Sequence, residues 1–389
     1  MENKNRLRQA QSDNGQAQSD NGQVQSKKDV KGDCQTEPVE VLITGAAGFI
    51  GHHLAKLLIQ NGYRVTGIDN INDYYDQNLK LARLRDLGID TSDLQENVPV
   101  QGDITFVKID LRDAEAVMNL FKESKFDYVV NLAAQAGVRY SLENPQSYVD
   151  NNITGFLNIL QACRAYPVKH LLFASSSSVY GLSEEIPFST NAHTDHPLAM
   201  YAASKKANEM MAHSYAHLFG IPSTGLRFFT VYGPWGRPDM ALHIFAKAIV
   251  EDKEFEVFNH GNMSRDFTYV ADIVESVKRL IPKPPQKNNP AFDPKKPVPS
   301  MSSAPYQIFN VGNNSPVALM DYVHGVEKAL GKKGKIVYKP MQPGDVSATY
   351  ANVQSLFDYI DFKPSTTIEE GIQAFVKQFL ALRASTGSA

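Results

Sequence analysis

Short, almost uninterrupted apolar runs recur along this chain, separated by polar or mixed sequence. They lie at 40–45, 64–69, 104–110, 128–134, 170–176, 223–229 and 306–312. Helix-like patterns fill most of the intervals, at 49–61, 78–87, 113–124, 147–165 and 200–219. Apolar strands that alternate with helices indicate a parallel sheet covered on both faces. The order of the elements therefore predicts an α/β protein with a doubly wound parallel sheet, a Rossmann-like fold of the dinucleotide-binding kind.

The pattern also divides the chain into parts. Residues 1–37 contain QAQSDNG twice in tandem and bury too little apolar surface to fold, so we predict a disordered low-complexity tail, with a specific tether as the alternative. Residues 38–229 form the predicted dinucleotide-binding domain. Residues 230–389 form mainly a smaller C-terminal substrate-binding lobe, in which 281–304, rich in Pro, Lys and Asn, make a long loop. Two later segments are expected to return to the first domain, near 266–280 and 306–312.

The composition narrows the class of protein. A formal net charge of −3 over 389 residues gives no basic surface, so no nucleic-acid partner is expected. No apolar run reaches membrane-spanning length and no signal peptide is evident, so no membrane association is expected either. The two cysteines, Cys34 and Cys163, do not make a disulfide framework, which fits a reducing, cytoplasmic location. The histidines include the pair His52 and His53 but no metal-binding set, so no metal is predicted.

A glycine-rich loop, GAAGFIG at 45–51, follows the first apolar run and precedes a helix. Gly45 permits a tight turn, Gly48 lets the backbone approach a diphosphate, and Gly51 lets the helix pack on the strand. The helix N-terminus, at Phe49 and Ile50, then faces the phosphates.

Acidic residues end the second and third predicted strands. Asp69 can accept hydrogen bonds from both hydroxyls of an adenine ribose and would repel a 2′-phosphate, which favours NAD over NADP. A purely structural turn at Asp69 and Asn70 is the alternative. Asp110 is placed to meet the adenine edge. The remaining predicted cofactor-binding residues are neighbours of strand ends: Asn70, Leu111, Ala133 and Ala134.

A tyrosine and a lysine stand four residues apart in YAASK, at 201–205. On a helix, this spacing puts Tyr201 and Lys205 on one face. Because a nearby cation lowers the pKa of a phenol, we expect Tyr201 to act as a base near neutral pH.

GAAGFIG, Asp69, the stretch SSSSVYG at 175–181 and YAASK together resemble the extended short-chain dehydrogenase/reductase family, over about residues 40–380. The resemblance implies that Ser176 hydrogen-bonds the substrate hydroxyl beside Tyr201. It also implies that Lys205 holds the nicotinamide ribose, so that Ser176, Tyr201 and Lys205 form the catalytic set.

The residues after Ser176 bear on the reaction. Family members that dehydrate a sugar carry Asp-Glu here, because elimination of water needs an acid and a base beside the reacting carbons. Decarboxylating relatives carry a Glu in this segment. This chain has Ser177 and Ser178 instead. Without a carboxylate, the expected reaction is oxidation and re-reduction at one carbon, which is epimerisation.

Two further stretches are similar to the UDP-glucuronate 4-epimerases of bacteria and plants: FFTVYGPWGRPDM at 228–240 and DNINDYYD at 69–76. The resemblance implies interconversion of UDP-glucuronate and UDP-galacturonate. The uronate carboxylate needs hydrogen-bond donors, and the candidates are Ser177, Ser178, Thr230 and Arg237, with Arg139 as a weaker second arginine. By the same resemblance, Arg265 grips the diphosphate and Asp345 lies near the uridine ribose.

The sequence also leaves other functions possible. A 4-epimerase of UDP-N-acetylhexosamine or its uronate would share the catalytic residues, whereas a UDP-glucuronate decarboxylase would need an acid near Ser177. A non-catalytic NAD-binding sensor would have no need of Tyr201 and Lys205. The family resemblance also implies a homodimer that pairs the helices at 147–165 and 200–219.

Overall fold

The structure of the protein, a computed structural model, describes residues 38–342 and 346–385. The chain divides between Glu37 and Pro38, and the second unit, which begins at Pro38, is compact. The predicted disordered tail, Cys34 and Asp345 lie outside the described residues.

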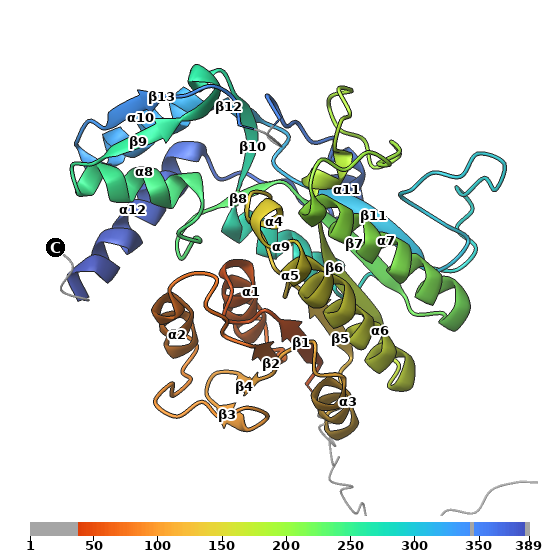
Figure 1. Cartoon of the computed structure of the whole chain (residues 1–389). Helices are drawn as coiled ribbons and strands as arrows, with labels where there is room; N and C mark the ends of the chain where they lie inside the picture. The colour runs from red at the N-terminus through yellow and green to blue at the C-terminus, as the bar shows by residue number, and fades with distance from the viewer. Residues whose placement is uncertain (1–37, 343–345, 386–389) are drawn as a thin grey trace, which may run out of the picture. The chain divides into compact units, whose positions relative to one another are not determined.

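A large sheet runs through the second unit, with its strands in the order β11-β7-β6-β5-β1-β2-β4-β3 (Figure 1). The strands are β1 (Glu40–Thr44), β2 (Arg64–Asp69), β3 (Pro99–Gln101), β4 (Thr105–Lys108), β5 (Tyr128–Asn131), β6 (His170–Ser176), β7 (Ser223–Phe228) and β11 (Tyr306–Val311). All neighbouring pairs are parallel except β3 and β4. The chain builds outward from β1 through β2 and β4, then crosses to β5 and continues the other way. The predicted doubly wound sheet is confirmed, and its reversal point lies between β1 and β5.

Both faces of the sheet are buried, which is why its strands read as continuous apolar runs. On β1, Val41 and Ile43 belong to the apolar core on one face and Leu42 to the core on the other. The helices of the first face are α1 (Phe49–Gln60) and α9 (Val270–Leu280), and those of the second are α3 (Ala114–Glu123), α6 (Gly155–Ala165) and α7 (Met200–Phe219). α2 (Gln77–Arg85) follows β2, and the side chain of Asp76 caps its first turn by accepting from the Asn78 N–H.

The helix predicted at 147–165 is wrong in detail. This stretch forms α5 (Gln146–Tyr148), a π-helical turn η1 (Val149–Thr154) and then α6. The side chain of Asn152, within the π turn, is buried and hydrogen-bonds Gln135 and Ser204. Within α6, Cys163 is a buried free thiol.

Smaller elements lie beyond β7. β8 (Thr230–Tyr232), β10 (Ser264–Tyr269) and β12 (Pro316–Ala318) form one sheet, and β9 (Glu254–Val257) and β13 (Lys335–Tyr338) form another. The helices that follow them are α8 (Ala241–Val250), α10 (Leu319–Leu330), α11 (Gln354–Ile360) and α12 (Ile368–Ser385). α8, α10 and α12 surround a separate apolar core that includes Phe245, Tyr322 and Phe375. Residues 281–305, between α9 and β11, contain no helix or strand apart from an isolated bridge at Met301.

None of the helices that the structure describes combines the length and apolar character needed to cross a membrane.

Candidate active site

A cavity of about 360 Å³ lies along the carboxyl ends of the central strands. Its walls come from the loops after β1, β2, β4, β5, β6 and β7 together with α7. Of the predicted site residues, it is lined by Gly45, Gly48, Phe49, Ile50, Gly51, Asp69, Asn70, Asp110, Leu111, Ala133, Ala134, Ser176, Ser177, Ser178, Tyr201, Lys205, Thr230 and Arg237. Parallel strands end at a common edge, so segments far apart in the chain meet here.

The glycine loop after β1 is shaped to receive a diphosphate. Gly45 has φ +74, and a Cβ on Gly48 would come within 2.9 Å of the Gly45 carbonyl oxygen. Gly48 is the N-cap of α1 and supplies no side chain to the first-turn N–H groups. These N–H groups have no partner within the helix and can donate to an anion. The loop therefore fits the diphosphate of a dinucleotide.

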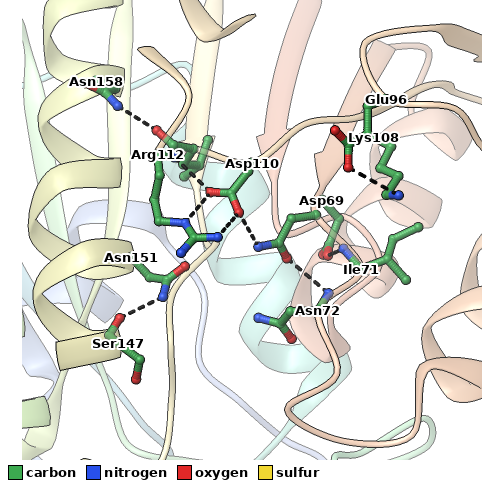
Figure 2. A network of polar contacts seen from close by, with 12 residues as sticks. Asp69, Ile71, Asn72, Glu96, Lys108, Asp110, Arg112, Ser147, Asn151 and Asn158 are labelled. Carbon is green, nitrogen blue, oxygen red and sulfur yellow. Dashed lines mark hydrogen bonds and ion pairs between the residues drawn. The ribbon is translucent and has the colours of Figure 1, made fainter. Parts of the chain in front are cut away.

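The end of the cavity where the adenine of NAD is expected, here called the adenine end, lies beside a network of polar side chains after β2 and β4 (Figure 2). Asp110 accepts from Nε and Nη2 of Arg112, at 2.9 and 2.7 Å, and from Nδ2 of Asn70 at 3.0 Å. Burial alone would raise the pKa of Asp110, but these hydrogen bonds hold it below its usual value. Asp69 accepts from the Ile71 N–H at 2.8 Å, so it makes the structural turn considered above while also lining the cavity.

The catalytic candidates meet at the other end of the cavity. Tyr201 and Lys205 lie one turn apart on α7, and both line the cavity, as the spacing predicts. The ammonium of Lys205 donates to the Ala174 carbonyl at 2.9 Å, and burial lowers its pKa to about 8. Burial raises the pKa of Tyr201, while a hydrogen bond with Ser176 and the charge of Arg237 work in the opposite direction.

The expectation that Lys205 lowers the pKa of Tyr201 needs correction. The ammonium is directed to the Ala174 carbonyl, and the cation that acts on the phenol is Arg237. Because burial is the largest influence, the pKa of Tyr201 lies above its usual value.

The four consecutive serines separate into two roles. The hydroxyl of Ser175 donates to the buried Glu209 at 2.7 Å, so it belongs to the support of α7. Ser176 ends β6, accepts from the Ser178 N–H at 3.2 Å and donates to the Ser178 hydroxyl at 3.1 Å. Ser177 and Ser178 begin the 3₁₀ turn η2 (Ser177–Tyr180), which holds them at the cavity wall.

Arg237 comes from the loop after β8 and reaches the same end of the cavity. Its Nε and Nη2 donate to the two carboxylate oxygens of Asp239, at 2.9 and 2.7 Å, and the Tyr74 hydroxyl donates to Asp239 at 3.2 Å. Among the lining residues that the structure describes, the carboxylates are Asp69 and Asp110, both at the adenine end. The cavity wall around Tyr201 therefore offers hydroxyls and a guanidinium, and the carboxylate paired with that guanidinium, Asp239, is not itself among the lining residues.

Two predicted substrate residues, Arg139 and Arg265, lie elsewhere. The guanidinium of Arg139 stacks on the Phe258 ring at 5.0 Å, and Nη1 of Arg265 donates to the carbonyls of Ser264 and Ser347. Neither arginine lines the cavity, and Asp345 lies outside the described residues. The structure thus does not bring Arg139 or Arg265 to the catalytic end.

Sequence reasoning missed Asn152, a buried polar hub beside α7. Its Oδ1 accepts from the Gln135 N–H at 2.7 Å, and its Nδ2 donates to the Ser204 hydroxyl at 2.9 Å. Asn208 donates to its carbonyl at 2.6 Å. The signal was an Asn-Asn pair inside an apolar helical pattern, where a polar side chain needs a buried partner.

Residues from the segment after Asp69 were also missed. Tyr74, Tyr75 and Lys80 line the cavity, and Nζ of Lys80 donates to the Asn72 side chain at 2.6 Å. The described residues contain no cluster of three or more His, Cys, Asp or Glu side chains placed to hold a metal ion.

A family model described as the NAD-dependent epimerase/dehydratase family matches residues 41–293. The chain belongs to this family. The recognition of the family, the fold class and the choice of NAD as cofactor, all made from the sequence, are therefore confirmed. The glycine loop described above fits that cofactor.

Similar proteins cover nearly the whole second unit. Protein CapI of Staphylococcus aureus is 54% identical over 342 residues, which are 88% of this chain and 98% of that protein. A probable UDP-glucuronate 4-epimerase of Rhizobium meliloti (strain 1021) is 45% identical over 339 residues, 87% of this chain and 96% of that protein. The crystal structure of the UDP-glucuronic acid 4-epimerase from Bacillus cereus, in complex with UDP-glucuronic acid and NAD, has a TM-score of 0.73 at 30% identity, covering 88% of this chain and 100% of that one.

Proposed function

We propose that this protein is an NAD-dependent nucleotide-sugar 4-epimerase that interconverts UDP-glucuronate and UDP-galacturonate. One observation carries the choice of a uronate: Ser177, Ser178, Thr230 and Arg237 line the cavity beside Tyr201, and no carboxylate lines that end among the described residues. A substrate carboxylate would find donors there, whereas an acidic side chain would repel it. The names of the Rhizobium and Bacillus proteins support the same substrate.

The chain's own residues would carry the proton transfers. Bound NAD supplies the oxidation and reduction by taking a hydride from the sugar and returning it. Tyr201, in its phenolate form, would accept the proton of the 4-hydroxyl and later give it back; the hydrogen bond with Ser176 and the charge of Arg237 favour that form against the effect of burial. Lys205 is held by the Ala174 carbonyl on the same face of α7, where it can bind the nicotinamide ribose.

The oxidised sugar brings a hazard that is specific to uronates. A ketone at carbon 4 makes the sugar a β-keto acid, which loses CO₂ when the bond to its carboxylate aligns with the carbonyl π system. Hydrogen bonds from Ser177, Ser178, Thr230 and Arg237 would fix the carboxylate out of that alignment and stabilise its charge. We therefore assign these residues a protective as well as a binding role.

Two alternatives share the catalytic residues. A 4-epimerase of UDP-N-acetylhexosamine or its uronate differs only in the shape of the sugar pocket. A UDP-glucuronate decarboxylase would use the same oxidation but release CO₂, and the missing acid near Ser177 makes it the weaker candidate. We also propose, from the sequence, a cytoplasmic homodimer with residues 230–389 mainly forming the substrate lobe.

The deciding experiment is to incubate the purified protein with UDP-glucuronate, without added NAD, and to follow the products by proton NMR. UDP-galacturonate without CO₂ release is the expected result. UDP-xylose or a 4-keto-pentose would overturn the protective role, and turnover of UDP-N-acetylglucosamine alone would overturn the uronate. Tyr201→Phe should lose about a hundredfold or more in rate while keeping NAD, because the acid–base group is gone.

A further inference from the structure

Arg83 is a buried cation outside the cavity lining. Its side chain lies on α2 and is 0% exposed. Among the described residues no ion pair to its guanidinium is formed, and its Nε has no hydrogen-bond partner. Burial accordingly lowers the pKa of Arg83. The charge of Asp69 acts on Arg83 from a distance and only partly offsets burial. A buried charge without a direct ion pair is costly, so its retention calls for a function.

The remaining donors of Arg83 join two loops that are far apart in the chain. Nη1 donates to the Ala47 carbonyl at 3.0 Å and to the Tyr75 hydroxyl at 2.7 Å. Nη2 donates to the Trp235 carbonyl at 2.6 Å. Ala47 belongs to the glycine loop, and Trp235 stands two residues before Arg237. One guanidinium therefore ties the diphosphate loop to the loop that presents Arg237.

The loop with Trp235 contains a backbone conformation that is unusual for a residue with a side chain. Trp235 has φ +60, in the left-handed region that disfavours a residue with a Cβ. Its N–H donates to the Gln378 side chain at 3.0 Å, and its ring packs on His52 with centroids 5.3 Å apart. Such strain persists only where the surroundings hold it, so the bond from Arg83 helps to maintain the loop.

We infer that Arg83 is a positioning residue for both halves of the site. Its buried positive charge, set behind the glycine loop, strengthens anion binding at the N-terminus of α1. Its bond to the Trp235 carbonyl keeps Arg237 at the catalytic end of the cavity. The first half concerns NAD alone, whereas the second rests on the proposed function, because it concerns the handling of a uronate. The charge of Arg83 acts strongly here because the side chain is fully buried and solvent screens it little.

Two substitutions at this position separate charge from geometry. Arg83→Gln removes the charge, and we expect the dissociation constant for NAD, measured by calorimetry without sugar, to rise about tenfold or more. Arg83→Lys keeps the charge but loses the planar fork that reaches both carbonyls. It should retain NAD, yet raise the KM for UDP-glucuronate about tenfold or increase the 4-keto-pentose by-product. Lys56→Gln, which removes an exposed cation from α1, is the matched control and should change neither quantity.

The outcomes test the two proposed roles of Arg83 separately: the effect of its charge on NAD binding and the positioning of Arg237. Unchanged NAD affinity in a folded Arg83→Gln protein would overturn the role of the charge, whatever the sugar substrate is. If Arg83→Lys has the KM for UDP-glucuronate and the products of the wild type, Arg83 does not position Arg237. If neither variant folds, Gln378→Leu tests the same positioning of the Arg237 loop, because the Gln378 side chain accepts the hydrogen bond from the Trp235 N–H. That variant should keep NAD and alter uronate handling, and a wild-type KM and product ratio would refute the positioning.

Discussion

At the scale of single residues, the buried charge of Lys205 lowers the stability of the folded protein. Lys205 is 3% exposed, and its ammonium donates to the neutral Ala174 carbonyl. Burial disfavours the charged form, which is why the pKa falls from 10.5 to about 8. The proposed binding of the nicotinamide ribose by Lys205 gives a reason for a cation at this buried position.

Lys205→Met should therefore abolish epimerisation and yet raise the stability of the NAD-free protein near pH 7. The ordinary pKa of 10.5 applies to the unfolded chain, and the folded value is about 8. Between these values the unfolded state binds more protons, so wild-type stability rises with pH across this window. The variant's advantage, on the order of 3 kcal/mol below pH 8, should disappear by about pH 10.5.

Chemical denaturation at several pH values measures this difference. Lys122→Met, at an exposed position on α3, is the control and should show no such trend. A Lys205→Met protein that is less stable than wild type at pH 7, or whose advantage does not change with pH, would contradict the account.

Arg237→Ala tests the carboxylate site. Removing a charged hydrogen-bond donor costs about 1.5–3 kcal/mol, so the KM for UDP-glucuronate should rise about ten- to a hundredfold or the 4-keto-pentose fraction should increase. Product NMR with initial-rate kinetics measures both. Arg64→Ala, at a 61% exposed side chain on β2, should leave them unchanged. If Arg237→Ala matches wild type in both, the assignment of Arg237 is wrong.

At the scale of elements, a buried ion pair orients the catalytic helix. Nε and Nη2 of Arg227, on β7, donate to the carboxylate oxygens of Glu209, on α7, at 2.8 and 2.9 Å, and both side chains are 0% exposed. Ser175, at the end of β6, donates to the same carboxylate. These bonds fix the rotation of α7, and with it the direction in which Tyr201 faces.

Arg227→Met should destabilise the protein by about 3–5 kcal/mol, because it removes the guanidinium from the buried Glu209 carboxylate and leaves the more distant Lys206 ammonium, at 3.8 Å, as its ion-pair partner. The double variant Glu209→Leu with Arg227→Met should recover part of that loss, since neither charge is then buried. Urea denaturation of the single and double variants measures the difference. If the single and the double variant lose the same stability, the loss comes mainly from packing and not from the buried Glu209 charge.

The elements themselves were largely predictable. Every strand in the parallel part of the main sheet coincides with a predicted run, because burial on both faces makes such strands continuously apolar. The short edge strand β3 was missed, since its residues are mostly exposed and carry no such signal. The π turn around Asn152 was missed because one extra residue per turn hardly changes a helical pattern.

At the scale of the whole molecule, the predicted homodimer would be formed through the outer surfaces of α6 and α7. α6 and α7 contact each other, and Leu157 on α6 and Met210 on α7 are 37% and 49% exposed. Apolar side chains on the outer faces of two neighbouring helices are suited to pack against a symmetry-related pair.

Leu157→Glu with Met210→Glu should convert a dimer into a monomer, because it would bury like charges at the interface. Sedimentation velocity at micromolar concentration measures the change. Leu380→Glu, at a 43% exposed position on α12, should leave the dimer intact. A wild-type monomer, or a dimer unaffected by the double change, would show that these helices are not the interface.

The sequence by itself determined the strand–helix alternation, the glycine loop, the Tyr201 and Lys205 pair and the serines after β6. These features depend on local spacing and on the chemistry of side chains that stand close together in the chain. Only the tertiary structure decided that Arg237 acts on Tyr201, that Asn152 joins Gln135 to Ser204, and that Arg83 joins Ala47 to Trp235. Each such contact links segments that meet at the carboxyl edge of the sheet, and a buried polar group shows its purpose only when its distant partner is known.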